Sequence, residues 1–259
     1  MMNIQITDYS VILAFWLSFA RWLAIMFQLP LFDSANIPQI VKILGIIVIS
    51  YAFFPFVEPL LMKDIAFVGT DNFWFLTIFN VVVGLVIGYF VKAIMSVFIA
   101  AGSVITQQIG FGAIRYFDPN AAQSIGPFEK LIQWTMVVLI LSSGALIPMF
   151  KGVIATFHSI HIYDLGKFAK SPEFFIEFFK SLFLAALLLS TPLIFTNILI
   201  MAILGVIART VPQMNVLMVS FVVNIGLGLL VFIATSDEFF QVAYKIYTDQ
   251  LGSWFQLVI

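Results

Sequence analysis

The chain has 259 residues, of which 62% are hydrophobic and 10% are charged, and its net charge is −1. Because a soluble domain is about one-quarter charged, this chain lacks the polar groups that a water-facing surface requires, and we expect an integral membrane protein. The low charge without a basic stretch excludes nucleic-acid binding, and the absence of cysteine excludes disulfides and thiolate metal sites.

The N-terminal ten residues contain Asp8 and neither Lys nor Arg. They therefore lack the basic region and the small-residue cleavage site of a signal peptide, and we expect the first apolar segment to stay in the protein. No linker rich in Ser, Pro or Gly divides the chain, which predicts a single membrane domain over residues 1–259.

The apolar segments can be compared with the ~20 helical residues that cross a bilayer core. The first is Val11–Leu29, which Arg21 interrupts. Residues 43–57 are uncharged but number only 15, and we expect Pro55 to shorten the usable helix further. Phe73–Val91 and Leu131–Phe150, with 19 and 20 uncharged residues, have the length of ordinary spans.

The last two apolar segments are unusually long. Ser181–Ala208 has 28 uncharged residues and Thr210–Ser236 has 27, so each helix must tilt, bend or leave the bilayer. Pro192 is the expected bend point, and residues 237–246 read as an amphipathic tail that suits a packing surface better than a span. The pattern predicts an all-α fold of helical hairpins with bent long helices. With six spans both termini would share a side, but the even spread of Lys and Arg does not decide the orientation.

Two features of the apolar segments point to contacts inside the membrane. An arginine at mid-span costs roughly 2.5–3.5 kcal/mol on insertion scales, so Arg21 should face a polar interior or an acidic partner. A buried pair that joins helices is the favoured reading over a direct role in transport, and Arg209 is expected at a helix end. Gly84 and Gly88 form a GxxxG pattern, which lets another backbone approach, either within this chain or in a partner.

The sequence has no motif of an enzyme or a nucleotide-driven motor. It lacks the phosphate-binding GxxxxGK[ST] motif and the HExxH and GxSxG motifs. His158 and His161 have a spacing that could share a metal ion, but no third ligand is near, so loop histidines without a metal are favoured. We therefore predict a protein that is not an enzyme and has no cofactor.

Residues 100–120 combine polar side chains and glycines within an oily chain. Irregular backbone at membrane depth is tolerated only inside protein or beside a water-filled cavity, and glycine permits unusual backbone angles. Both a pore-lining re-entrant loop and an ordinary connecting loop fit this pattern. The candidate loop residues are Thr106, Gln107, Gln108, Gly110, Phe111, Gly112, Arg115, Tyr116 and Phe117.

Three groups of motifs occur in a specific order. The first group is Arg21, Pro30, NIPQIVK ending at Lys42, and Pro55; the second is VVVGLVIGYF, AAGSVITQQIGFG and Asp118-Pro119; the third is Pro192, Asn197 and ARTVPQMNV at 208–216. In this order and spacing they resemble the FliR family of flagellar export-gate proteins, shared with the SctT-type subunit of injectisomes. One departure is Asn80, which stands where the family pattern has an acidic residue.

The resemblance implies a core subunit of a flagellar type III export gate in the bacterial inner membrane, at the flagellar basal body. One copy would assemble with FliP-like and FliQ-like subunits, and its fold would resemble a fusion of these two partners. Other export-apparatus membrane proteins, lipids and unfolded export substrates are further implied partners. The loop at 106–117 would plug the channel, and polar contacts within or between subunits would involve Arg21, Lys42, Arg209, Gln213 and Asn215.

Three other functions remain open at this point. An injectisome subunit of the same family would carry the same motifs. A small-molecule secondary transporter would explain broken helices and Arg21, but it predicts an internal repeat and midplane binding charges, which the sequence does not display. A purely structural membrane scaffold would leave residues 100–120 as an inert loop.

Overall fold

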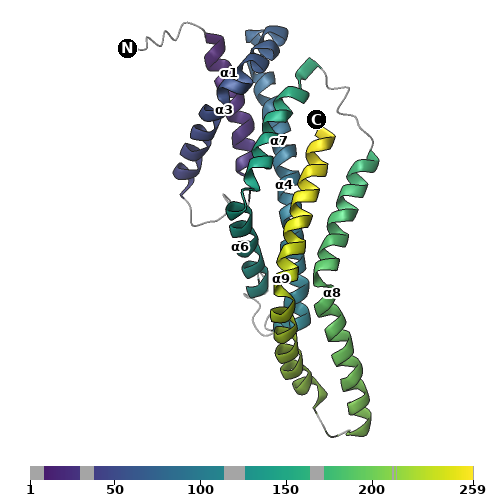
Figure 1. Ribbon diagram of the computed structural model, residues 1–259. Coiled ribbons are helices and arrows are strands. Elements are labelled where there is room, and N and C mark those ends of the chain that lie inside the picture. The colour runs from purple at the N-terminus through teal and green to yellow at the C-terminus, as the bar shows by residue number, and fades with distance from the viewer. Residues whose placement is uncertain are drawn as a thin grey trace. The chain divides into compact units, whose positions relative to one another are not determined.

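The computed structural model describes residues 9–29, 38–113, 126–163, 172–211, 213 and 215–258. The regular structure in these ranges is entirely helical (Figure 1), and the predicted all-α fold is confirmed. Two short 3₁₀ helices, η1 (Thr70–Asn72) and η2 (Phe111–Ala113), accompany the longer helices. These are α1 (Tyr9–Met26), α3 (Gln39–Val68), α4 (Phe73–Ile109), α6 (Pro127–Ser142), α7 (Leu146–Ser159), α8 (Pro172–Thr210) and α9 (Val216–Val258).

Five helices in the described ranges are long and apolar enough to cross a membrane, namely α1, α3, α4, α8 and α9. The count rises to six if the shorter α6 and α7 together form one broken span. Length and composition are the grounds for both numbers.

The chain divides into two compact units. Unit 1 comprises residues 1–93, 144–174 and 250–259, and unit 2 comprises residues 94–143 and 175–249. Unit 1 contains α1, α3, α7, the first part of α4 and the end of α9. Unit 2 contains the second part of α4, α6 and most of α8 and α9.

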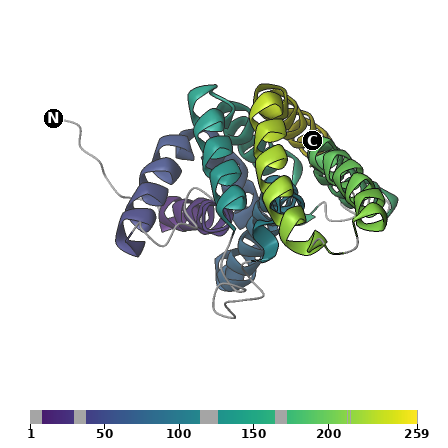
Figure 2. The same cartoon turned by 90° about the horizontal axis from the view of Figure 1, so that it is seen from below.

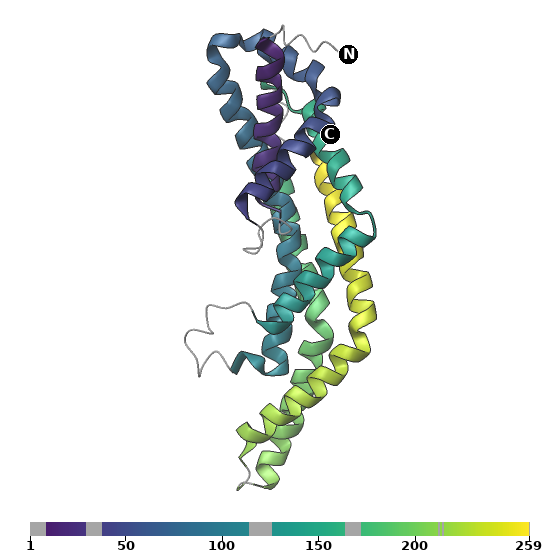
Figure 3. The same ribbon diagram turned by 90° about the vertical axis from the view of Figure 1, so that its left-hand side faces the viewer.

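An aromatic cluster forms much of the core of unit 1. In this unit α1 lies against α3, and α3 contacts α7 (Figures 1 and 3). Trp22 of α1 is fully buried and stacks on Phe53 of α3, with ring centroids 5.4 Å apart, and it also contacts Phe150 of α7 at 5.8 Å. Such aromatic pairs contribute about 0.5–1.5 kcal/mol each beyond the burial of their area.

The helix α4 approaches α1 closely at the two glycines of the GxxxG pattern. A Cβ atom on Gly84 would lie 2.6 Å from the carbonyl oxygen of Arg21 and 2.8 Å from the Cβ of Ala24. On Gly88 it would lie 3.1 Å from the Cα of Ile25. The backbone that these glycines admit therefore belongs to this chain.

The structure corrects the expected effect of Pro55. Instead of ending early, α3 continues for 30 residues from Gln39 to Val68 and contains both Pro55 and Pro59. Each proline removes one backbone donor and displaces one preceding carbonyl, which bends a helix without ending it when the neighbouring turns are well packed. Both prolines are exposed, so their rings do not displace the side chains that pack against α1 and α7.

In unit 2, α8 and α9 lie side by side (Figures 1 and 2). Helix α8 continues through Pro192, and α9 is one helix of 43 residues. The predicted amphipathic tail at 237–246 continues the preceding apolar segment as part of this one helix. No Gly or Pro occurs between Gly228 and Gly252, and the charged residues after Ser236 are exposed, so no helix-breaking residue interrupts the helix there.

We predict that Gly84→Ala destabilises the protein. The added methyl group would meet backbone of α1 at 2.6 Å, and overpacking of this kind costs about 1–3 kcal/mol. Thermal unfolding in detergent, followed by circular dichroism, measures the change. Gly45→Ala in α3 is the matched control, because no atom lies within 4 Å of its added methyl group, and it should leave stability equal or higher; equal melting temperatures for both variants would contradict the contact.

Candidate functional site

The candidate loop begins later than the sequence suggests. Thr106, Gln107 and Gln108 are helical and belong to the last turn of α4, so the expected non-helical backbone from 106 onwards is wrong for these residues. The Thr106 hydroxyl donates to the carbonyl of Gly102 at 2.7 Å, one turn earlier, which keeps the polar side chain bonded inside the helix. Ile105 and Ile109 are fully buried and hold this turn in the core of unit 2.

The helix ends where glycine permits a left-handed backbone. Gly110 has φ +96°, a conformation that costs roughly 1–2 kcal/mol for other residues. Its amide donates to the carbonyl of Gln107 at 3.1 Å, and the chain then enters η2 at Phe111. The predicted break thus lies at a single residue, in the position where glycine commonly ends a helix.

A side chain from another helix bonds the exposed end of α4. The last four carbonyls of a helix lack partners within it. The Asn197 side chain of α8 donates from Nδ2 to the carbonyl of Gln108 at 2.8 Å. Two of the sequence motifs, one containing Gln108 and the other containing Asn197, therefore meet at the helix end in unit 2.

Helix α9 packs directly against the same point. A Cβ atom on Gly228 would lie 3.0 Å from Cγ1 and 3.3 Å from Cα of Ile109, so the glycine allows the close contact. Gly110 faces Asn224 and Ile225 of α9 at ordinary contact distance. Asn224 is 5% exposed, and its Oδ1 has no hydrogen-bond partner in the described part of the chain.

Aromatic rings connect the residue after the break to α6 and α9. The ring of Phe111 lies 5.8 Å from that of Phe128, and Phe128 meets Phe232 edge to face at 5.2 Å. Phe111 is half-buried, whereas Phe128 and Phe232 are buried. Phe111, the first bulky side chain after Gly110, therefore packs within unit 2.

The start of α6 is also held against α4. The Glu129 carboxylate accepts from the amide of Gly126 at 2.8 Å, which satisfies a free donor at the helix start. A Cβ atom on Gly102 would lie 2.7 Å from the Cα of Glu129, so Gly102 permits close packing of α6 on α4. The connection between these anchored ends includes Arg115, Tyr116 and Phe117, which lie outside the described residues.

Several residues at this site were not predicted from the sequence. Asn224, Gly228 and Phe128 contact the end of α4 or the residue that follows the break, and Glu129 of α6 packs against Gly102 of α4. A polar residue and a glycine within the apolar part of α9 were the available signals for Asn224 and Gly228. Nothing in the sequence indicated which helix they would face.

The remaining polar candidates occupy other places. Lys42 is half-buried on α3, and Arg209 is exposed in the last turn of α8. Gln213 and Asn215 are exposed between α8 and α9. The Asn215 Oδ1 accepts from the amide of Met218 at 3.3 Å and so caps the start of α9.

Arg21 is buried in unit 1. Its Nε donates to Oδ1 of Asn80 at 3.0 Å, and one guanidinium NH₂ nitrogen donates to the carbonyl of Thr156 at 3.2 Å. The guanidinium lies 4.0 Å from the ring centre of Phe157. Asn80 therefore accepts from Arg21 as a neutral amide.

The two histidines do not face a common site. His158 is exposed, and its Nδ1 lies 3.2 Å from the carbonyl of Ile154. His161 is buried and faces Asp64. Within the ranges that the structure describes, no group of three or more His, Cys, Asp or Glu side chains could hold a metal ion.

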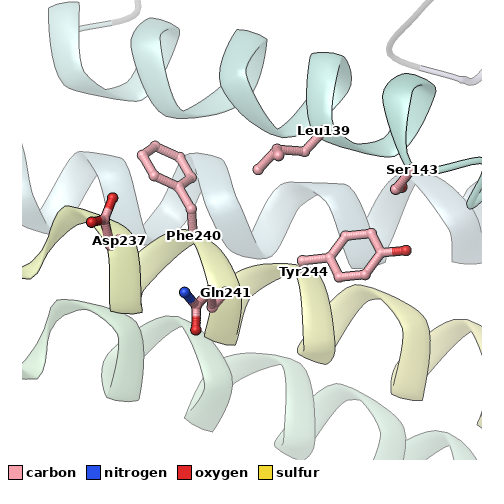
Figure 4. A pocket seen from close by; sticks show the side chains of 6 residues that line it. All are labelled: Leu139, Ser143, Asp237, Phe240, Gln241 and Tyr244. Carbon is pink, nitrogen blue, oxygen red and sulfur yellow. The ribbon is translucent and has the colours of Figure 1, made fainter.

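A shallow hollow of about 330 Å³ lies between α6 and α9 in unit 2. Figure 4 shows the Phe240 ring and the Leu139 side chain pointing into the space between the two helices. Asp237 is the acidic group of the lining, which contains no His, Lys or Arg. The lining residues are Leu139, Ser143, Asp237, Phe240, Gln241 and Tyr244.

Comparison with known proteins gives consistent similarities over nearly the whole chain. The family model of bacterial export proteins, family 1, matches residues 12–249. The flagellar biosynthetic protein FliR of Aquifex aeolicus is 25% identical over 94% of this chain and 95% of its own length. FliR of Bacillus subtilis is 26% identical, over 91% and 90%. The surface presentation of antigens protein SpaR of Shigella flexneri is 23% identical, over 89% and 91%.

We predict that Gly110→Ala lowers stability by roughly 1–2 kcal/mol, because alanine at φ +96° is strained. The apparent melting temperature in detergent measures the loss. Gly112→Ala is the matched control: its Cβ would make only ordinary contacts, from 3.4 Å, with Gln107. A loss of stability at Gly112 equal to that at Gly110 would contradict the assignment of the strain to the helix end.

Proposed function

The chain belongs to the bacterial export proteins, family 1, and from this premise we propose that it forms and closes part of the channel through which unfolded flagellar proteins are secreted. The family and the FliR relatives indicate a subunit of the flagellar export apparatus. The closing element is the segment that begins at Gly110. The left-handed helix end at this residue, inside an otherwise apolar chain, is the observation that carries the proposal.

A helix that stops among apolar surroundings must have its free carbonyls bonded by protein or water. At the end of α4 one such carbonyl is bonded by Asn197 from α8. The buried oxygen of Asn224 lies in a residue that faces Gly110. These amide groups support a role for the break as a functional element, since an inert connection would more simply lie at the surface.

Closure would rest on apolar side chains. Apolar constrictions block ions by excluding water, and Phe111 follows the hinge glycine directly. Its contact with Phe128 would hold the closed position. The single hydrogen bond from Asn197 contributes about 0.5–1.5 kcal/mol, which is weak enough for an entering polypeptide to displace the segment and for the segment to return.

The exposed apolar surface supports assembly with other membrane proteins. Ile40, Leu44, Val48 and Tyr51 share one face of α3 and are all exposed in this chain. Lipid or partner helices would cover such a face. We propose that one copy assembles with FliP-like and FliQ-like subunits in the inner membrane, at the flagellar basal body, as a structural component rather than an enzyme.

The injectisome remains the second candidate system because SpaR is 23% identical to the chain over nearly the same span. Identities of 25% and 26% with two FliR proteins favour the flagellar system. Complementation separates the two. A flagellar subunit should restore swimming to a strain that lacks its own FliR, whereas an injectisome subunit should restore effector secretion instead.

Deletion of residues 110–112 should make the membrane leak ions while the export complex still assembles. The deletion removes the proposed hinge at Gly110 and Phe111, the first bulky apolar side chain of the proposed closing segment. Membrane potential, reported by a voltage-sensitive dye in cells, measures the leak. Gly205→Ala on an exposed face of α8, where the methyl group meets no atom within 4 Å, is the control. A deletion variant that assembles and holds the potential would remove the closing role.

Asn197→Asp should weaken closure because a carboxylate cannot donate to the carbonyl of Gln108. We expect a measurable leak with secretion retained, assayed by the same dye and by immunoblots of secreted flagellar proteins. Asn215→Asp is the matched control, since Asn215 uses its oxygen as an acceptor and aspartate caps a helix equally well. Identical behaviour of the two variants would argue against the bond to Gln108.

A further inference from the structure

A buried polar cluster lies in unit 1 and has no part in the closing segment. It gathers at the last turn of α7 and contains side chains from three other elements. Arg21 comes from α1, Asn80 from α4 and Asp64 from α3, and His161 follows α7 directly. Arg21 and Asn80 are fully buried, Asp64 is 1% exposed and His161 is 9% exposed.

Both ring nitrogens of His161 face hydrogen-bond acceptors. Nδ1 lies 3.3 Å from Oδ1 of Asp64, and Nε2 lies 3.0 Å from the carbonyl oxygen of His158. A neutral imidazole carries one hydrogen and can donate to only one of these oxygens. The other nitrogen would then direct its lone pair at an oxygen lone pair, inside a buried site where an unmade bond costs most.

We propose that Asp64 and His161 form a proton-binding site. The pair holds one proton more than a neutral imidazole and an ionised carboxylate together. The Nε2 hydrogen is donated to the carbonyl of His158, and the additional proton lies on the line between Nδ1 and Oδ1. The ligand is thus a single proton, and its binding completes both hydrogen bonds of the ring.

The end of α7 favours positive charge at this place. Helix carbonyls at a C-terminus carry partial negative charge and attract cations. The carbonyl of Thr156 accepts from Arg21, and the carbonyl of His158 accepts from His161. The Arg21 guanidinium and the His161 ring therefore both lie at the negative end of one helix.

Asp64 is the acidic group that offsets these charges. It interacts electrostatically with both Arg21 and His161. The side chain that α4 places against Arg21 is the neutral amide of Asn80. It adds no second negative charge that would compete with Asp64 for Arg21. The Phe157 ring lies against the Arg21 guanidinium, and the negative face of the ring stabilises that cation.

The other titratable groups around the pair leave this arrangement intact. The ring of Tyr163 stacks on that of His161, with centroids 4.9 Å apart. The ring of His158 is exposed and faces the carbonyl of Ile154. Lys63, next to Asp64 in sequence, is exposed.

The proton would control how the chain after α7 is attached to α3. With the proton bound, His161 joins the end of α7 to Asp64. Loss of the proton leaves one ring nitrogen opposite an acceptor, so one of the two bonds is lost. The protonated pair therefore joins His161 both to the end of α7 and to Asp64 of α3, whereas the deprotonated pair keeps only one of these two bonds. This gives the export subunit a response to proton concentration that the proposed closing segment does not require.

Nuclear magnetic resonance of the full chain in lipid nanodiscs tests the site directly. The sequence contains two histidines, so ¹⁵N-histidine labelling gives few signals, and His158→Gln leaves His161 alone while keeping the backbone carbonyl at 158. We expect the His161 ¹⁵N signals to show a protonated Nε2 at neutral pH. We also expect one further proton, either on Nδ1 or on the Asp64 carboxyl, whose protonation the ¹³C signal of the carboxyl carbon reports. These reporters should change in one shared transition as the pH rises.

Asp64→Asn should abolish that shared transition, whereas Asp71→Asn, the same substitution at an exposed acid of η1, should leave it unchanged. A bare Nε2 at neutral pH, or a bare Nδ1 beside an ionised carboxylate, would overturn the proposal. This test of the unaltered pair remains decisive if Asp64→Asn does not fold. It is also independent of channel closure, because no export assay enters it.

Discussion

The structure depends on one constraint: a backbone that leaves the helical conformation among apolar side chains still needs hydrogen bonds. At the end of α4 this need is met from a distance, since Asn197 of α8 bonds the carbonyl of Gln108. The contact requires that α8 come close to the break, and Gly228 lets α9 approach the same point. The aromatic contacts of Phe111 then fill the space beside the hinge. The packing of α8 and α9 around the end of α4, and the position of Phe111 just after it, are thus linked to the hydrogen bond that completes this helix end.

The sequence predicts the helical fold well. The bilayer core sets the length of an apolar segment that crosses it and requires that segment to satisfy its own backbone hydrogen bonds, as a helix does. The sequence predicts helix ends less well. Charges were taken as boundaries, yet α3 includes Lys42 and Glu58, and α9 passes through Asp237 and Glu238. A charged side chain on an exposed face leaves the backbone bonds of a helix intact, so charge marks a change in surroundings without marking an end. Gly110 ends α4 because its backbone angle is unavailable to other residues at low cost, so this boundary is one that residue type could predict.

At the candidate site, the sequence identified the residues of the break and missed most of their neighbours. Gly110, Phe111 and Asn197 belong to recognisable motifs, whereas Phe128 and Gly228 derive their importance from what lies across from them. Helical spacing predicts which residues share a face but not which helix that face meets. The same limit applied to the GxxxG pattern, whose partner proved to be α1 of the same chain. Asn80 illustrates the opposite case, because the sequence singled it out and the structure shows that it bonds the buried Arg21.

The bonding of Arg21 has a consequence for the order of events during synthesis. Its acceptors lie 59 and 135 residues further along the chain, so the ribosome delivers the arginine long before the groups that surround it. Until α4 arrives, α1 holds a cation that the bilayer alone opposes by roughly 2.5–3.5 kcal/mol. The first helix must therefore wait beside the translocation machinery, or shift its arginine toward the headgroups, and it takes its final depth only after later helices have been inserted. The first helix to be synthesised is consequently the last to reach its final position in the membrane, because that position depends on groups that are synthesised later.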